Sequence, residues 1–215
     1  MQVNQYYSIE GISGAGKSTL ISLLKDAHSD LFYYPQRKHE EEFESFVEQQ
    51  NISLKPLETA PAQNAKFGKF LAFEADKLSL VDTALSNHTV VSDRDYLSCF
   101  SAGYTHAVVK NTGNERFIRN RIEWFRDQPF FRPPDTRFYL DLPVKEAIRR
   151  KTRRGDGEVL TNCQRSLVDY LQIQQDFEKQ YISEMEPERT VYLNGLRATD
   201  DLFRTANQTV RGSFQ

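Results

Sequence analysis

The stretch GISGAGKS, residues 11–18, follows the alternating apolar segment YYSIE and precedes a run with helical periodicity, LISLLKDA. Gly11, Gly16, Lys17 and Ser18 satisfy the pattern G-x-x-x-x-G-K-[ST]. Glycines are needed there because consecutive backbone N–H groups must converge on phosphate oxygens, which requires unusual dihedral angles and no side-chain bulk. A glycine-rich turn with an exposed lysine is the alternative, but a strand before and a helix after favour a phosphate-binding loop.

This loop predicts an ATP site that also holds Mg²⁺. Lys17 is expected to reach the β- and γ-phosphates, and the Ser18 hydroxyl is expected to bind the metal. The helix that begins near Lys17 adds its positive N-terminal dipole. The residues expected to bind ATP are Gly11, Ser13, Gly14, Ala15, Gly16, Lys17, Ser18 and Thr19.

Apolar segments with β-propensity alternate with helical patterns along the rest of the chain. The expected strands cover residues 5–10, 31–34, 89–93, 137–142 and 190–194. The expected helices cover residues 20–27, 66–85, 117–128, 144–154 and 163–182. This alternation predicts an α/β protein in which a five-stranded parallel sheet carries helices on both faces as three α/β/α layers. The phosphate loop after the first strand indicates a P-loop NTPase fold. With no repeat or linker, residues 1–215 are expected to form one domain.

The composition and charge of the chain limit the kinds of partner that it can be expected to bind. Hydrophobic residues make up 39% of the 215 and charged residues 27%, which is typical of a globular protein. The net charge of -2 argues against binding a nucleic-acid polymer. Cys99 and Cys163 form no metal-ligand or disulfide pattern, and no apolar run or leader-like start suggests a membrane. We therefore expect a cytoplasmic protein.

Asp93 and Arg94 follow the third expected strand. Parallel α/β sheets bind ligands at the carboxyl ends of their strands, so this pair is expected beside the phosphate loop. The carboxylate suits Mg²⁺ or a proton, and the guanidinium suits a second phosphate. A simple ion pair at the strand end is the alternative.

A basic segment, IRRKTRR at 148–154, precedes Gly155-Asp156-Gly157. Such a run usually marks a solvated helix face or a patch that binds nucleic acid. Beside a phosphate loop it predicts a lid, at about 148–160, that closes over the phosphates and neutralises charge in the transition state.

Together these segments resemble the thymidylate kinase family of nucleoside monophosphate kinases. Residues 10–19 match its opening, roughly E-G-x-D-G-A-G-K-[ST]-T, and SDRDYLS at 92–98 resembles D-R-Y-x-x-S. YPQR at 34–37 is similar to F-P-E-R or R-E-P, and FEADK at 73–77 to F-x-A-x-R. Residues 147–155 fit the lid pattern R-x-x-x-R-G, and YLNGLRATDDLF at 192–203 looks like the last strand, the adenine-side turn and the C-terminal helix.

The resemblance implies roles for individual residues. Arg37 and Arg94 would fix the acceptor phosphate, Phe73 would stack on the acceptor base, and Lys77 takes the place of the arginine that contacts the pyrimidine. Arg150 and Arg154 would close from the lid. The catalytic set is thus expected to be Lys17, Asp93, Arg94, Arg150 and Arg154, with Ser18 and Asp93 at the metal. Family members commonly dimerise, so the resemblance also implies a homodimer.

Departures from the family pattern are all expected on the acceptor side. Ser13 replaces an acidic residue, Lys77 replaces an arginine, and Asp95 replaces an aromatic residue. Among the remaining residues, Tyr104 and His106 are expected on a solvated helix face, and Phe73 is as compatible with the core as with base stacking.

The sequence thus predicts an ATP- and Mg²⁺-dependent kinase that phosphorylates a (deoxy)nucleoside monophosphate, with a dTMP-like acceptor favoured. One alternative is a deoxynucleoside kinase that acts on a hydroxyl group. Another is a regulatory module that binds nucleotide without transfer. Trp124, Phe130 and Phe131 are expected in the core or at a subunit contact.

Overall fold

The computed structural model describes residues 4–34, 45, 48–49, 59–153 and 164–212. Its centre is a parallel sheet in the order β2-β3-β1-β4-β5. The strands are β1 (Tyr6–Glu10), β2 (Phe32–Tyr34), β3 (Val90–Asp93), β4 (Thr136–Asp141) and β5 (Thr190–Asn194). Each overlaps an expected segment, so the predicted five-stranded parallel sheet is confirmed.

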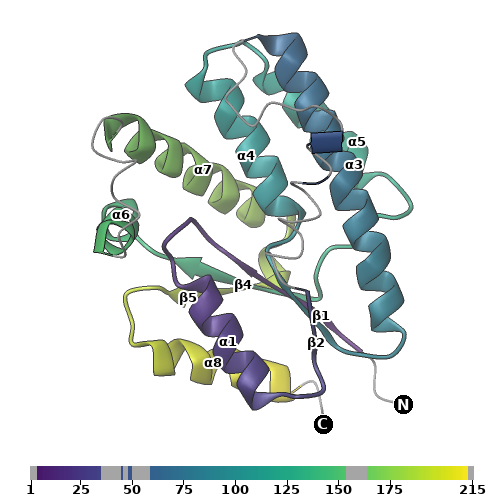
Figure 1. Cartoon of the computed structure of the whole chain (residues 1–215), viewed down its shortest axis with the longest axis vertical. Helices are drawn as coiled ribbons and strands as arrows, with labels where there is room; N and C mark the ends of the chain where they lie inside the picture. Colours follow the sequence, from purple (N-terminus) through teal and green to yellow (C-terminus); the bar gives the residue numbers. More distant parts are fainter. Residues whose placement is uncertain (1–3, 35–44, 46–47, 50–58, 154–163, 213–215) are drawn as a thin grey trace.

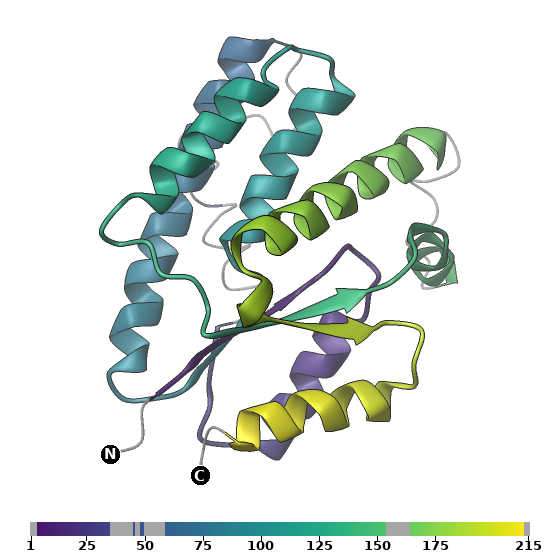
Figure 2. The same cartoon turned by 180° about the vertical axis from the view of Figure 1, so that it is seen from behind.

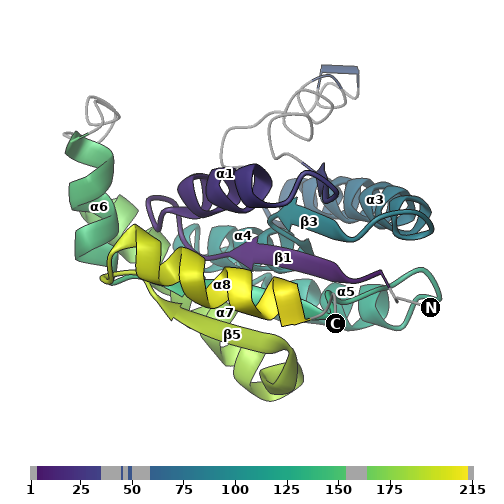
Figure 3. The same ribbon diagram turned by 90° about the horizontal axis from the view of Figure 1, so that it is seen from below.

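Helices cover both faces of this sheet, as Figure 1 and the reverse view in Figure 2 show. One face carries α3 (Ala60–Leu85), α4 (Tyr96–Val109), α5 (Glu115–Arg126) and α7 (Gln164–Met185). The other carries α1 (Lys17–Ala27) and α8 (Thr199–Gly212), which lie side by side in Figure 3. A short helix, α6 (Val144–Arg153), lies beyond the carboxyl ends of β4 and β5, and the 3₁₀ turn η1 (Pro187–Arg189) leads into β5. The predicted three-layer α/β/α arrangement is confirmed.

The side chains of β1 alternate between the two faces. Tyr6 belongs to the apolar cluster under α3, α4 and α7, whereas Tyr7 and Ile9 belong to the cluster under α1 and α8. Successive residues of a strand point to opposite faces, so Ser8 and Glu10 share the α4 side with Tyr6. Both are fully buried, and the α4 side of the sheet therefore contains a polar layer close to the phosphate loop.

The register of β1 and β3 brings distant segments together. Ile9 lies opposite Asp93 in this parallel pair, and the Arg94 backbone N–H donates to the Ile9 carbonyl oxygen at 3.1 Å. Asp93 and Arg94 therefore lie beside the start of the phosphate loop, as predicted from the strand direction.

Helix α4 is absent from the elements expected from periodicity. It packs against α3, α5 and α7, so buried residues occur on several sides of it and hide the one-sided apolar pattern of a surface helix. For the same reason the expectation of a solvated face at Tyr104 and His106 is wrong. Tyr104 stacks on Phe177 with ring centroids 4.7 Å apart, and His106 lies against Tyr170.

One helix boundary needs correction. Helix α3 begins at Ala60 rather than residue 66, with Pro61 in its first turn, where the missing N–H of proline costs nothing. Trp124 is 48% exposed on α5, which excludes the core and leaves the subunit contact of its two expected roles. None of the helices in the described ranges is both long and apolar enough to cross a bilayer.

Candidate functional site

The phosphate loop depends on three glycines with positive φ. Gly11, Gly14 and Gly16 have φ values of 129°, 94° and 107°. A Cβ on Gly11 would lie 2.6 Å from the Leu140 carbonyl oxygen, and one on Gly14 would lie 2.7 Å from the Ala147 carbonyl oxygen. The loop is therefore pressed between the end of β4 and helix α6, where only glycine fits.

Lys17 lies inside this loop and is only 6% exposed. Its Nζ donates to two loop carbonyl oxygens, the shorter bond reaching Gly11 at 2.7 Å. Burial, and then the positive charge of Arg94, lower the pKa of Lys17 to about 7, while Glu10 and Asp93 oppose the shift. These charged groups are thus within electrostatic range of one another, and a bound phosphate would stabilise the ammonium form.

A cavity of about 330 Å³ opens next to the loop. It lies between the start of α1, the last turn of α6 and the turn after β5. Its polar and glycine lining residues are Gly14, Gly16, Thr19, Arg150, Arg153, Gly195, Arg197 and Thr199. This cavity has the position and charge for the phosphates and base of a bound nucleotide.

Arg150 and Arg153 face this cavity from α6. Nη2 of Arg150 donates to the Gly195 carbonyl oxygen at 2.8 Å, and its Nε donates to Glu146 at 3.1 Å. Arg150 is thereby held against the turn after β5. The sequence reasoning did not single out Arg153, although it lies three residues, or about one helical turn, after Arg150.

Of the residues assigned to ATP, four line this cavity: Gly14, Ala15, Gly16 and Thr19. Ala15 is buried and lines it, and Ser13 is half-buried. Ser18 and Thr19 are exposed in the first turn of α1. The Ser18 hydroxyl and the Asp93 carboxylate offer oxygen ligands, which suit Mg²⁺.

Arg94 has a strained backbone that its neighbours hold in place. Its φ of 73° is left-handed, a conformation that costs a non-glycine residue about 1–2 kcal/mol. Its carbonyl oxygen accepts hydrogen bonds from Ser92 Oγ at 2.8 Å and from Lys77 Nζ at 3.2 Å. Its Nη1 donates to Ser98 Oγ at 2.9 Å. Such strain, stabilised from several sides, is typical of a functional residue.

Glu10 is a site residue that sequence reasoning treated only as part of a matching motif. Its carboxylate accepts the Asp95 backbone N–H at 2.6 Å and the Ser98 hydroxyl at 2.7 Å. Burial, and then the negative charge of Asp95, raise the pKa of Glu10 to about 8, while Arg94 opposes the shift. Glu10 therefore connects β1 to the Arg94 turn and carries a carboxyl group that titrates near neutral pH.

Lys77 lies beneath Arg94 and is 2% exposed. Besides donating to the Arg94 carbonyl, its Nζ pairs with Glu74 at 3.2 Å. Burial alone would lower the pKa of Lys77, but Glu74, Tyr6 and Asp95 raise it above the ordinary value. Phe73, half-buried, precedes it by one turn on the same helix face. Contact of either residue with an acceptor remains a prediction.

Asp95 is a correction to the sequence analysis, which expected it on the acceptor side. Its side chain is fully buried and faces the layer between the sheet and α4, where it accepts bonds from Arg137 Nε at 2.9 Å and Ser8 Oγ at 2.7 Å. The carboxylate also accepts the Leu97 N–H and so caps α4. Its partners come from β1 and β4, so adjacency in sequence could not reveal them.

Helix α7 contributes two groups that the sequence did not indicate. Glu178 is fully buried and accepts hydrogen bonds from Ser101 and Tyr139, while burial raises its pKa. Burial raises the pKa of Tyr170 to about 12, an effect that Arg94 opposes. Both therefore lie within electrostatic range of Arg94.

Two predicted site residues cannot be placed. Arg37 and Arg154 lie outside the described residues, as does most of the expected lid at 148–160.

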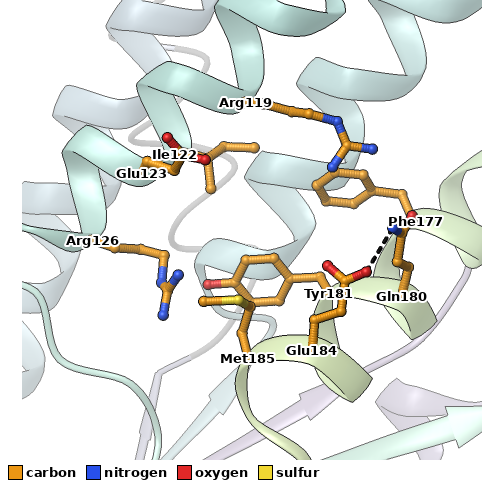
Figure 4. A pocket seen from close by; sticks show the side chains of 9 residues that line it. All are labelled: Arg119, Ile122, Glu123, Arg126, Phe177, Gln180, Tyr181, Glu184 and Met185. Carbon is orange, nitrogen blue, oxygen red and sulfur yellow. Dashed lines mark hydrogen bonds between the residues drawn. The ribbon is translucent and has the colours of Figure 1, made fainter.

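A separate cavity of about 160 Å³ lies between α5 and α7, as Figure 4 shows. The guanidinium of Arg119 lies over Phe177, and that of Arg126 lies over Tyr181. Glu123 and Glu184 also line this cavity, and no phosphate-loop residue does. It is distinct from the cavity next to the phosphate loop.

Comparisons with known proteins agree with this geometry. Residues 9–205 match the family model described as thymidylate kinase. A probable thymidylate kinase of Methanobrevibacter smithii is 27% identical over 186 residues, which cover 82% of this chain and 84% of that protein. A probable thymidylate kinase of Thermococcus kodakarensis is 28% identical over 201 residues, covering 86% of this chain and 91% of that protein.

Among solved structures, the chain is similar to deoxyadenosine kinase from M. mycoides. The structure with the products dCMP and a flexible dCDP gives a TM-score of 0.65 at 16% identity, covering 96% of this chain and 98% of that one. The structure with bound dATP gives a TM-score of 0.67 at 16% identity, covering 97% of this chain and 100% of that one. This likeness shows a shared fold and confirms the predicted P-loop architecture.

Proposed function

The chain belongs to the thymidylate kinase family and is a phosphotransferase, and we propose that it transfers the γ-phosphoryl group of ATP to a (deoxy)nucleoside monophosphate, with a dTMP-like acceptor favoured. One observation carries this proposal. The β1–β3 register sets Arg94, a candidate anion-binding group, beside the phosphate loop, so two anion sites meet at one sheet edge. Transfer between two phosphates needs that arrangement.

On the donor side, the loop amides and Lys17 hold the β- and γ-phosphates, and the base and ribose occupy the cavity next to the loop. Arg150 and Arg153 neutralise phosphate charge from α6. Ser18 and Asp93 hold Mg²⁺, which when bound neutralises charge on the phosphates. Arg154 is assigned to the same role as Arg150.

On the acceptor side, Arg94 and Arg37 bind the acceptor phosphate, and Phe73 packs against the base. Lys77 acts beside them by fixing the Arg94 carbonyl. Little covalent work is left for the protein, because transfer depends mainly on alignment and charge neutralisation.

Glu10 supports a second candidate, a deoxynucleoside kinase. A hydroxyl acceptor loses a proton on phosphorylation, and a general base works best when its pKa lies near the working pH. The Glu10 carboxyl, with a pKa of about 8 and a link to Arg94 through Ser98, meets that requirement. A monophosphate acceptor, already ionised, does not need such a base.

The deciding experiment is an ADP-release screen with ATP and Mg²⁺ over nucleosides and monophosphates of every base. Transfer to monophosphates supports the proposal, and transfer to nucleosides alone supports the second candidate. Tight ATP binding without transfer to any acceptor would support the regulatory module instead. Lys17→Ala is the control, with turnover expected to fall at least about 100-fold. Retained turnover in Lys17→Ala would contradict the loop assignment.

We further propose a homodimer, as the family resemblance implies. Exposed aromatic side chains on α5 support this: Phe117 and Trp124 are 39% and 48% exposed, and the Arg121 guanidinium lies over both rings. Light scattering should give twice the mass of one chain. Trp124→Glu should yield the monomer, whereas Leu80→Glu, an equally exposed position on α3, should not. A wild-type monomer would contradict the proposal.

A cytoplasmic location is proposed on cysteine usage. Cys99 is free, and the sequence contains only one other cysteine, Cys163. Secreted domains of this size commonly carry disulfides, whereas reducing compartments keep such thiols free. Localisation of the tagged full chain would test this.

A further inference from the structure

Arg137 is an arginine buried within the sheet. It lies near the start of β4, opposite Ser8 of β1, and has no exposed surface. Its Nε donates to Asp95 Oδ2 at 2.9 Å, its Nη1 to Glu186 Oε2 at 2.5 Å and its Nη2 to the Tyr96 hydroxyl at 3.1 Å. Burial opposes its charge, but these partners keep its pKa above the ordinary value. Arg137 is therefore a fixed cation with three directed hydrogen bonds.

Asp95 connects Arg137 to the turn that contains Arg94. Within the described ranges its carboxylate is ion-paired with Arg137 alone. The same residue donates its backbone N–H to Glu10, and the peptide bond before it belongs to Arg94. A shift of the Asp95 side chain would therefore move the Arg94–Asp95 peptide plane, which belongs to the left-handed Arg94 turn.

A chain of hydrogen bonds through Glu10 and Ser98 also links Asp95 to the side chain of Arg94. Glu10 accepts the Asp95 N–H with one oxygen and the Ser98 hydroxyl with the other. Ser98 Oγ in turn accepts a hydrogen bond from the Arg94 guanidinium. A displacement of Asp95 would thus disturb both the backbone and the guanidinium of Arg94.

We propose that Arg137 is a positioning residue for phosphoryl transfer, which acts through Asp95 to hold Arg94 and Glu10 in their working arrangement. The inference rests on the acceptor-side role proposed for Arg94. The alternative is that the Arg137–Asp95–Glu186 cluster stabilises the fold and nothing more, as buried ion pairs can. Because left-handed arginine persists only where its surroundings fix it, loss of Arg137 should affect Arg94 specifically.

The test compares Arg137→Lys and Asp95→Asn with Ile122→Ala. Lysine keeps the positive charge but lacks the planar guanidinium, whose N–H groups donate in fixed directions. Asparagine keeps an oxygen to cap α4 but loses the charge that orients Arg137. Ile122 is buried in α5, outside the site, so Ile122→Ala controls for a loss of stability alone.

For Arg137→Lys and Asp95→Asn, we expect kcat/KM for the acceptor to fall at least tenfold, with the Kd for ATP within twofold of wild type. Amide hydrogen exchange at Asp95, read by NMR, should accelerate in Arg137→Lys. The Ile122→Ala control should melt at a lower temperature yet keep wild-type kcat/KM and wild-type exchange at Asp95.

Wild-type kinetics in a folded Arg137→Lys or Asp95→Asn protein would overturn the inference. Failure of both to fold would also overturn it, because the cluster would then serve the fold alone. If the wild type phosphorylates no acceptor, the proposed function fails, and the exchange rate at Asp95 still decides whether Arg137 fixes this turn.

Discussion

The Nζ of Lys77 donates a hydrogen bond to the backbone carbonyl oxygen of Arg94 over 3.2 Å. This contact joins α3 to the turn after β3 and links two residues that the sequence assigns to the acceptor. The ammonium is almost completely buried and is shared with Glu74. We therefore expect Lys77 to act on an acceptor through the conformation of Arg94.

For Lys77→Arg, we expect catalytic efficiency to fall by the same factor, about tenfold or 1.4 kcal/mol, with every acceptor base. The larger guanidinium cannot keep both the Glu74 pair and the Arg94 contact without shifting its neighbours. The measurement is kcat/KM over a panel of bases. A changed rank order among the bases would show instead that residue 77 reads the base directly.

Arg94→Ala and Arg94→Gly separate the side chain from its strained backbone. Both should abolish acceptor binding while the Kd for ATP stays within about twofold, because both lack the guanidinium. Glycine adopts φ of 73° without steric cost, so Arg94→Gly should unfold with a free energy about 1 kcal/mol larger than that of Arg94→Ala. Denaturant titrations and ATP titrations check this. A drop in ATP affinity in both variants would place Arg94 on the donor side.

Gly14→Ala should weaken ATP binding, whereas Gly113→Ala should not. Both glycines have positive φ, so each alanine costs about 1–2 kcal/mol in backbone conformation. Only at Gly14 would the new Cβ also meet a backbone atom, the Ala147 carbonyl oxygen at 2.7 Å; around Gly113 there is open space. ATP affinity and melting temperature of the two variants are the readouts. Equal ATP affinity would mean that the loop does not depend on its fit against α6.

The raised pKa of Glu10 predicts that the free energy of unfolding depends on pH. Its folded pKa is raised from 4.5 to about 8, so between these values the folded chain retains a proton that the unfolded chain has lost. Stability from this group is therefore complete below pH 4.5 and is lost as the pH rises toward 8, by up to about 1.4 kcal/mol per pH unit.

Glu10→Gln cannot titrate, so the melting temperature of the wild type minus that of Glu10→Gln should fall between pH 5 and pH 8. Scanning calorimetry at several pH values measures this difference. A difference that stays constant with pH would show that Glu10 is ionised throughout this range in the folded protein.

Much of the fold follows from local sequence. The five strands were predictable because each is a short apolar run between helical patterns, and the parallel sheet followed from their alternation with helices. The loop was predictable because the requirements of phosphate binding are local: Gly11, Gly16, Lys17 and Ser18 lie within eight residues. Helix α4 escaped prediction because it is surrounded by other helices and lacks a single apolar face.

The sequence by itself determined the phosphate loop, the strand-end position of Asp93 and Arg94, and membership of a kinase family. Only the tertiary structure showed that Glu10, Lys77 and Ser98 hold Arg94, and that the buried Asp95 side chain binds Arg137. The physical reason is that backbone conformation and loop chemistry depend on neighbours along the chain. Buried charges depend on partners that the fold brings together from β1, β4 and α3; Glu10 and Asp95, for example, are 85 residues apart in the sequence.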